Sequence, residues 1–213
     1  FFLTAFNYLV SIYSDSSDTI SSSVHNGRID SRWGRIAGCL FSNYGFRRKF
    51  EETESMVDAV RTSGRQILET MRCYLKNPHP DEMFFQYQGK LLEHDCLGGA
   101  PAQSIPLQLD SLPFHLMVMN SKGGYRYELR FWENRFDGRM LQMFLDALDA
   151  ILEAMLTASK LSQLHDALPK TLFPAAGTPE IRDRYGRLQP IGAWGTLTQN
   201  GVDRTARILL DGT

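Results

Sequence analysis

Histidine and cysteine side chains, which supply many catalytic groups and metal ligands, are few and scattered in this sequence. The histidines are His25, His79, His94, His115 and His165. They show neither the spacing of a zinc site nor the paired histidines of a metalloprotease helix, so no metal site is expected. The cysteines are Cys39, Cys73 and Cys96. Their odd number and wide separation argue against a disulfide framework and favour a cytoplasmic location.

The motifs that mark common enzyme classes do not occur in the sequence either. It contains no phosphate-binding loop, nucleophile elbow or dinucleotide fingerprint, and its carboxylates are too scattered to propose an acid and base pair. His115 lies among large apolar residues of a predicted strand. We interpret it as a hydrogen-bonded structural residue rather than a catalytic base. The residue types therefore predict no catalytic group on this chain.

Polar side chains do gather where one predicted strand ends. Residues 19–24 are rich in serine and β-branched residues, which predicts a strand, and the turn His25-Asn26-Gly27-Arg28 follows them. These groups either line the mouth of a ligand channel or form a solvated connection. The residue types alone favour the solvated connection.

The elements that position such groups are clearest between residues 112 and 156. Apolar residues alternate with other residues over 114–119 and again over 125–132, which predicts two strands, and Gly123-Gly124 between them favours a tight turn. From residue 141 to residue 155 apolar residues recur at three- and four-residue steps, which predicts an amphipathic helix. A hairpin packed beside a helix forms half of a layered α/β core.

Weaker patterns predict the remaining elements. We expect helices over residues 3–13, 51–75 and 161–168, and strands over residues 36–49 and 83–88. The acidic run 51–54 is expected to favour the start of the second helix through the helix dipole. A long loop is expected over 89–106. Dense turn signals in residues 180–213 predict a small meander of strands.

Length and composition limit the class of protein. A chain of 213 residues can hold one sizeable core, or one domain with a small appendage. Its net charge of −1 argues against a broad nucleic-acid-binding surface. No apolar run has the length of a membrane span, and no signal-peptide pattern occurs. The chain starts at Phe1 without an initiator methionine and stops on a turn signal, so we interpret it as a fragment of a longer polypeptide.

Several segments, taken in order, resemble the C-terminal lobe of a nonribosomal peptide synthetase condensation domain, a family of the chloramphenicol acetyltransferase-like superfamily. Residues 19–28 (TISSSVHNGR) resemble a family strand and turn of the pattern VIGTPVSGR. Residues 37–47 (AGCLFSNYGFR) resemble IGxFVNTxxxR, with Gly38 and Arg47 at its glycine and arginine and Ser42-Asn43 where Asn-Thr is usual. Residues 83–89 (MFFQYQG) and 112–156 resemble the next strand and the closing strand, turn, strand and helix.

The resemblance covers residues 3–168 and implies an α/β lobe with a mixed sheet and flanking helices. It also implies a part in amide-bond formation between a carrier-tethered thioester donor and an amine acceptor. The phosphopantetheine arms of the two carrier proteins are then substrates in a tunnel between two lobes, and no cofactor is bound directly. The residues that the resemblance places as candidates for that tunnel are Ser23, Asn26, Arg28 and Asn43.

The same resemblance sets the expected partners and the departures from the family. The expected partners are peptidyl or acyl carrier proteins, the N-terminal condensation lobe and neighbouring synthetase domains, with no nucleic acid and no membrane. The family's catalytic motif HHxxxDG belongs to the other lobe and does not occur in this sequence. Only residues 77–80 stand where the family carries a longer bridging segment. A non-catalytic module that docks carrier proteins or domains, or the matching lobe of an epimerisation or heterocyclisation domain, is the alternative.

The C-terminal stretch has a resemblance of its own. Residues 181–197 (IRDRYGRLQPIGAWGTL) resemble the adenylation-domain segment v.D..G...PiG..GEL, and residues 203–213 (DRTARILLDGT) resemble TGDlaRylpDGtie. Asp203 matches the ribose-binding aspartate of that segment only with a one-residue slip, and the phosphate loop and catalytic lysine segment are absent. We therefore expect a condensation-type lobe over 1–168, a linker over 169–179 and a β-rich adenylation-like appendage over 180–213 that cannot activate an amino acid.

Overall fold

The computed structural model describes residues 1–28, 31–38, 40–72, 82–89, 96–97, 100–101, 112–121 and 123–210. It divides into two compact units. The first unit consists of Phe1–Thr19, Arg47–Gln66 and Phe136–Thr213, and the second unit consists of Ile20–Phe46 and Ile67–Arg135. Several residues discussed above lie outside the described part of the chain, namely Cys39, Cys73, His79, His94 and the segment 77–80.

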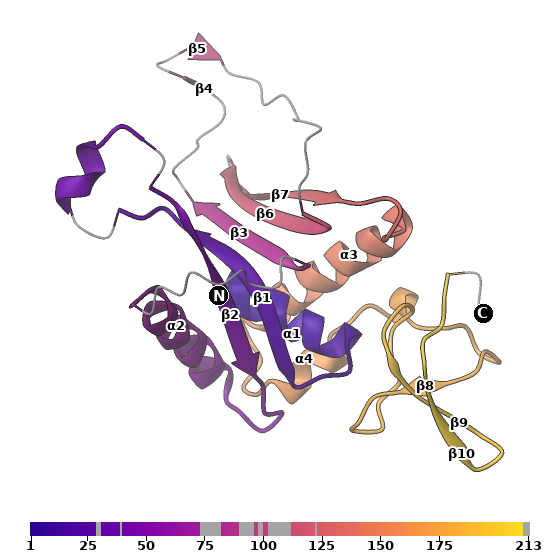
Figure 1. Cartoon of the computed structure of the whole chain (residues 1–213). Coiled ribbons are helices and arrows are strands. Elements are labelled where there is room, and N and C mark those ends of the chain that lie inside the picture. Colours follow the sequence, from indigo (N-terminus) through magenta and orange to yellow (C-terminus); the bar gives the residue numbers. More distant parts are fainter. Residues whose placement is uncertain are drawn as a thin grey trace. The chain divides into compact units, whose positions relative to one another are not determined.

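The chain contains both helices and strands, and among the described residues the strands β3 to β7 and β8 to β10 follow one another without a helix between them (Figure 1). The helices are α1 (Phe2–Tyr13), α2 (Met56–Arg72), α3 (Gly138–Ala154) and α4 (Ser162–Asp166), with 3-10 turns η1 (Ser31–Arg35) and η3 (Lys170–Leu172). The strands up to the hairpin are β1 (Asp18–His25), β2 (Ser42–Lys49), β3 (Phe84–Gly89), β4 (Cys96–Leu97), β5 (Ala100–Pro101), β6 (Phe114–Ser121) and β7 (Gly124–Phe131). The last strands are β8 (Ile181–Arg182), β9 (Gly195–Gln199) and β10 (Val202–Ala206).

Five strands form one mixed sheet in the order β2-β1-β3-β6-β7 (Figure 1). Strand β3 runs parallel to both β1 and β6, whereas β6 and β7 form an antiparallel hairpin. Parallel pairs require long crossovers: β1 is connected to β3 through η1, β2 and α2, and β3 is connected to β6 through the segment that contains β4 and β5. The mixed α/β fold predicted from the sequence is confirmed, as is a small sheet of three strands near the C-terminus.

The β6–β7 hairpin shows how position in the sheet decides burial. In β6 the four consecutive residues from Leu116 to Met119 are all buried, so this interior strand is covered on both faces rather than on one. The register pairs Ser121 with Gly124, and Gly123 adopts φ 84°, as a tight hairpin turn requires. Strand β7 forms an edge of the sheet and has no fully buried residue, so its apolar side chains stay partly in contact with solvent.

Helix α1 is the most deeply buried helix of the first unit. The sequence predicted one apolar face, but the polar residues Thr4, Asn7 and Ser11 are buried as well. Asn7 Nδ2 donates to the carbonyl of Leu3 at 3.0 Å, and Ser11 Oγ donates to the carbonyl of Tyr8 at 2.6 Å. These local hydrogen bonds satisfy Asn7 and Ser11, which would otherwise be costly to bury, whereas the buried Thr4 Oγ1 has no hydrogen-bond partner in the structure.

Helix α3 packs against α1 with the apolar stripe that its spacing predicted. The rings of Phe6 and Phe144 meet edge to face at 6.1 Å. Asp137, in the turn that precedes α3, accepts a hydrogen bond from the amide of Arg139 at 2.8 Å and so caps the helix.

The start of α2 corrects one prediction. The acidic run 51–54 does not begin the helix, which starts at Met56 behind Ser55. Ser55 Oγ accepts from the amide of Asp58 at 3.1 Å and donates to its carboxylate at 2.7 Å. The two carboxylates of Glu52 and Glu54 are instead engaged by arginines: Glu54 forms a nearly buried ion pair with Arg48 at 2.5 Å.

The C-terminal segment forms an antiparallel sheet in the order β10-β9-β8. The meander predicted for residues 180–213 is therefore confirmed over its described part. These strands belong to the same compact unit as α1 and α3. The proposed divisions at residues 168 and 179 stay predictions. Among the described helices, none combines the length and the apolar composition needed to cross a lipid bilayer.

Gly27 is predicted to be essential for the turn that follows β1. Its φ is +70°, and a Cβ at this position would lie 1.7 Å from the carbonyl oxygen of Leu40. The substitution Gly27→Ala combines left-handed strain with a collision against backbone, so it should lower the free energy of unfolding by about 2 kcal/mol or more. Urea unfolding followed by circular dichroism measures this.

Gly34, in the same connection between β1 and β2, provides the matched control. It has no atom within 4 Å of a built Cβ and no left-handed φ. Gly34→Ala should therefore leave the unfolding midpoint almost unchanged. Equal effects of the two substitutions would contradict the role assigned to Gly27.

Candidate functional site

The four residues predicted to line a tunnel all lie at the adjoining ends of β1 and β2, in the second unit. Ser23 is buried in β1, Asn26 and Arg28 belong to the turn after β1, and Asn43 is exposed near the start of β2. Burial raises the pKa of the neighbouring Tyr44 hydroxyl, and a hydrogen bond with Ser23 partly offsets that rise. Whether these side chains face a substrate tunnel stays a prediction.

Asn26 and Arg28 are brought together by the turn itself. The amide of Arg28 donates to Asn26 Oδ1 at 3.0 Å, which is the geometry of an Asx turn. The Arg28 guanidinium donates to three backbone carbonyls, those of Asn26, Ile36 and Gly38, each at 3.2 Å. Arg28 therefore closes the base of the long β1–β2 connection, a structural role that its motif position did not reveal.

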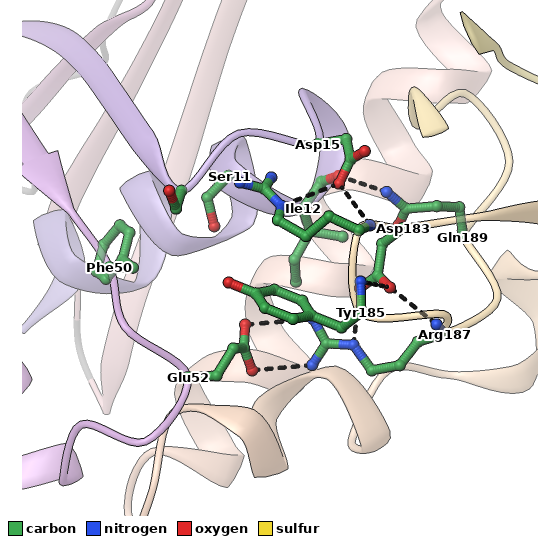
Figure 2. Close-up of a pocket in the computed structure, with 11 residues that line it drawn as sticks. Ser11, Ile12, Asp15, Phe50, Glu52, Asp183, Tyr185, Arg187 and Gln189 are labelled. Carbon is green, nitrogen blue, oxygen red and sulfur yellow. Dashed lines mark hydrogen bonds and ion pairs between the residues drawn. The ribbon is translucent and has the colours of Figure 1, made fainter. Parts of the chain in front are cut away.

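A second cluster of charged residues lies within the first unit and joins the C-terminal segment to α1 and to the loop before α2 (Figure 2). Its centre is Arg187. The Arg187 guanidinium binds both carboxylate oxygens of Glu52, at 2.9 and 3.2 Å, and its Nε donates to Asp183 at 2.7 Å. Burial opposes the charge on Arg187, but its hydrogen bonds with Glu52 and Asp183 outweigh that effect, so its pKa is raised. The arginine is thus held charged in a partly buried site.

Both carboxylates of this cluster have further donors. Asp183, whose side chain is only 5% exposed, also accepts from the amides of Tyr185 and Arg187 at 2.9 and 2.8 Å. Tyr8 OH donates to the carbonyl of Leu161 at 3.0 Å and lies 3.4 Å from Glu52. Burial and then the negative charge of Glu52 raise the pKa of the Tyr8 hydroxyl, so it stays protonated.

The end of α1 provides further contacts to the same segment. Asp15, in the left-handed region at φ 46°, accepts from the amide and the Nε of Arg184, both at 3.2 Å (Figure 2). Gln189 is 1% exposed, and its amide nitrogen donates to the carbonyls of Ile12 and Trp194 at 3.0 and 2.7 Å. The amide of Trp194 in turn donates to the carbonyl of Tyr13 at 2.9 Å. Hydrogen bonds to backbone carbonyls, as well as the Asp15–Arg184 ion pair, therefore hold the C-terminal segment against the end of α1.

The pocket enclosed by these residues is too small for a substrate. Its cavity measures about 20 Å³, which is room for a single water molecule. The site shown in Figure 2 is consequently a packed network of ion pairs and hydrogen bonds within the first unit and not a catalytic cleft. Over the described ranges, no group of three histidine, cysteine, aspartate or glutamate side chains could hold a metal ion.

Two histidines of the described part occupy structural positions. His115 Nε2 lies 3.1 Å from Gln86 Oε1, and its ring meets Phe84 edge to face at 4.9 Å. The predicted hydrogen bond of His115 is confirmed. His165 is buried and its Nε2 has no hydrogen-bond partner in the structure. Burial, followed by the positive charge of Arg187, lowers the pKa of His165, so it is neutral at physiological pH.

The residues that carried the adenylation resemblance make turns and strand contacts in this chain. Asp183 anchors the turn at Gly186, which has φ 79°, and Gly192 turns the chain at φ 85°. Asp203 lies on β10 and accepts from Thr198 Oγ1 at 2.6 Å. The adenylation-like origin of the segment stays a prediction.

Sequence reasoning missed the Arg187 cluster. Two signals were present: the acidic run 51–54 and three arginines at positions 182, 184 and 187 of an otherwise mixed segment. The acidic run and the arginine-rich segment are expected to attract each other. Glu52 and Arg187 are 135 residues apart, however, and no local sequence pattern specifies that these two residues pair.

Comparison with known proteins shows which solved structures share this fold. No family model matches the sequence, and no curated protein matches it. Solved structures do match. A four-domain nonribosomal peptide synthetase, holo-AB3403 bound to AMP and glycine, aligns with 86% of this chain and 17% of its own at a TM-score of 0.68 and 12% identity.

Two single-domain structures match as well. The condensation domain of the monacolin K polyketide synthase MokA aligns with 75% of this chain and 42% of its own, at TM-score 0.60 and 16% identity. The epimerization domain from the third module of tyrocidine synthetase B aligns with 78% of this chain and 41% of its own, at TM-score 0.56 and 12% identity. The chain thus has a condensation-domain fold and spans about two fifths of the length of these single domains.

The pair Glu52 and Arg187 is predicted to stabilise the first unit cooperatively. In a double-mutant cycle with Glu52→Gln and Arg187→Met, the coupling free energy measured by urea unfolding should be about 1 to 2 kcal/mol, because the contact is bidentate and partly buried.

The exposed pair Glu180 and Arg182, in the same segment, is the matched control. Its side chains are 60% and 50% exposed, so the corresponding cycle should give a coupling near zero. A Glu52–Arg187 coupling no larger than that of the control pair would show that the ion pair does not fasten the segment.

Proposed function

We propose that this chain is the C-terminal lobe of a condensation domain in a nonribosomal peptide synthetase. The observation that carries this proposal is the shared fold: a five-stranded mixed sheet with flanking helices that matches condensation-type domains over about two fifths of their length. Such a share is what one lobe of a two-lobed domain occupies. The motif resemblances of residues 19–28 and 37–47, which fall on β1 and β2, support the same assignment.

The reaction assigned to the whole domain is amide-bond formation. The amine nitrogen of a carrier-tethered acceptor attacks the thioester carbonyl of a carrier-tethered donor, so that a C–N bond forms and the C–S bond breaks. The amine loses a proton, and the departing sulfur is released as a thiol. Tethering both substrates makes the attack effectively intramolecular, which is the main source of acceleration open to such a site.

The part played by this chain is to bind and orient rather than to transfer protons. Its sequence lacks the family's histidine motif. Of its described histidines, His115 is a hydrogen-bonded strand residue, His165 is buried and neutral, and His25 accepts a hydrogen bond from the amide of Gly27. Ser23, Asn26, Arg28 and Asn43 are the residues proposed to face the phosphopantetheine arms. Arg28 acts by holding the β1–β2 connection in shape.

The proposed partners are carrier proteins, the other lobe and neighbouring synthetase domains. The matched share of this chain rises from 75% and 78% in single domains to 86% in the four-domain synthetase. The rise supports a neighbouring domain as the counterpart of part of the C-terminal segment. The phosphopantetheine arms enter as substrates, and a cytoplasmic location suits the thiol chemistry.

An alternative is a lobe of a related domain that forms no amide bond. The epimerization domain matches this chain nearly as well as the MokA condensation domain does, with TM-scores of 0.56 and 0.60. The fold alone therefore favours neither reaction. A non-catalytic docking module is the further alternative, because residues 77–80 replace a longer bridging segment of the family.

We predict that residues 1–213 alone are catalytically silent and that the complete natural polypeptide forms the amide. The lobe and the complete protein are each incubated with a donor thioester and an acceptor amine, both loaded on carrier domains, and products are identified by mass spectrometry. The control is the complete protein with its motif histidine replaced. Turnover by residues 1–213 alone, or no product from the complete protein above the histidine-variant background, would contradict the proposal.

A further inference from the structure

The connection between β1 and β2 is an unusual surface of the second unit. Every residue from Ser31 to Gly38 is exposed, and the 3-10 turn η1 lies at the far end of this loop, away from the strands (Figure 1). A stretch of eight consecutive exposed residues contributes little to the core. Its residue types are therefore not explained by folding.

The composition of this loop is that of a protein interface. Trp33, Ile36 and Phe41 are 43%, 46% and 61% exposed. Arg32 and Arg35 lie in the 3-10 turn η1 together with Trp33. Tryptophan, phenylalanine and arginine are the residue types enriched at the energetic centres of protein interfaces. Three large apolar side chains left in solvent within nine residues favour a partner that covers them.

The loop has a net positive charge, whereas the chain as a whole has a net negative charge. Between residues 28 and 41 the sequence has three arginines and one aspartate, a net charge of +2, whereas the whole chain has a net charge of −1. The surface outside the loop is therefore net negative. This contrast favours a partner that meets the loop alone through a local acidic patch, and it disfavours a long polyanion that would extend beyond the loop.

The loop is held in shape at its base. Gly27 packs against the carbonyl of Leu40, and the Arg28 guanidinium binds the carbonyls of Ile36 and Gly38. These contacts join the two ends of the connection. A surface whose frame is fixed before binding loses less conformational entropy when a partner docks.

We propose that the described loop residues 31–38 and 40–41 dock a carrier protein through an acidic surface beside its phosphopantetheine arm. This inference rests on the proposed function and names the surface that one of its partners contacts. Arg32 and Arg35 attract the acidic surface, and Trp33, Ile36 and Phe41 pack against its apolar residues.

The test measures binding of the full 213-residue chain to isolated peptidyl carrier domains, in apo and phosphopantetheinylated forms, by biolayer interferometry. The charge-reversal variant Arg32→Glu/Arg35→Glu should weaken binding at least about tenfold, and raising the salt from about 50 to about 300 mM should weaken wild-type binding in the same direction. Trp33→Ala should weaken binding about tenfold with little change in salt dependence.

The matched control is Arg61→Glu/Arg65→Glu. These arginines are exposed on α2, and their reversal changes the net charge by the same amount. The control variant should bind within about twofold of wild type. Because all the substituted side chains are exposed, thermal melting is expected to be unchanged, which separates loss of binding from loss of fold.

Three outcomes would overturn the docking proposal. Loop and control variants that bind equally well would show that the carrier protein docks elsewhere. A wild-type chain that binds no carrier domain in either form would remove the proposal, while amide formation by the complete protein would leave the proposed function intact. Displacement of the carrier domain by single-stranded RNA at equal affinity would identify the loop as a nucleic-acid surface instead.

Discussion

The partly buried guanidinium of Arg187 is the constraint on which the first unit depends. The guanidinium binds both carboxylate oxygens of Glu52, and its Nε donates to Asp183. Asp183 also accepts from the amide of Tyr185 and so stabilises the turn that leads to Arg187. A charge held in such a site is stabilising only when its partners are all in place, because removing one leaves another charge poorly solvated. The loop before α2 and the C-terminal segment are therefore linked energetically, as are α1 and that segment through Gln189.

The contacts of Arg187 and Gln189 change how the C-terminal strands are understood. The sequence suggested an adenylation-like appendage, and its matching residues here build turns rather than a nucleotide site. Strands β8 to β10 are carried by the same compact unit as α1 and α3. On the proposed function, such a segment would hold a following synthetase domain at a fixed place on the lobe. On the same proposal, the lobe contributes a binding surface and the catalytic groups belong to the other lobe.

The parts of the fold that depend on local pattern were predictable, and those that depend on distant partners were not. Helix α3 and the β6–β7 hairpin follow from apolar spacing and from the glycine turn at Gly123. The burial of β6 on both faces and the exposure of β7 follow from sheet order, which no local pattern specifies. The start of α2 was misplaced because Glu52 and Glu54 have arginine partners, one of them 135 residues away. The strand and turn that contain Ser23, Asn26 and Arg28 were predictable from residue types, but the backbone contacts of Arg28 were not.

Native-state hydrogen exchange tests most directly whether the C-terminal segment is an integral part of the first unit. The amides of Ile191 and Trp194 donate to the carbonyls of Leu172 and Tyr13. If the segment and α1 open together, these two amides exchange with the same opening free energy as the amides of α1. Rapid exchange at Ile191 and Trp194 while the amides of α1 stay protected would contradict the account.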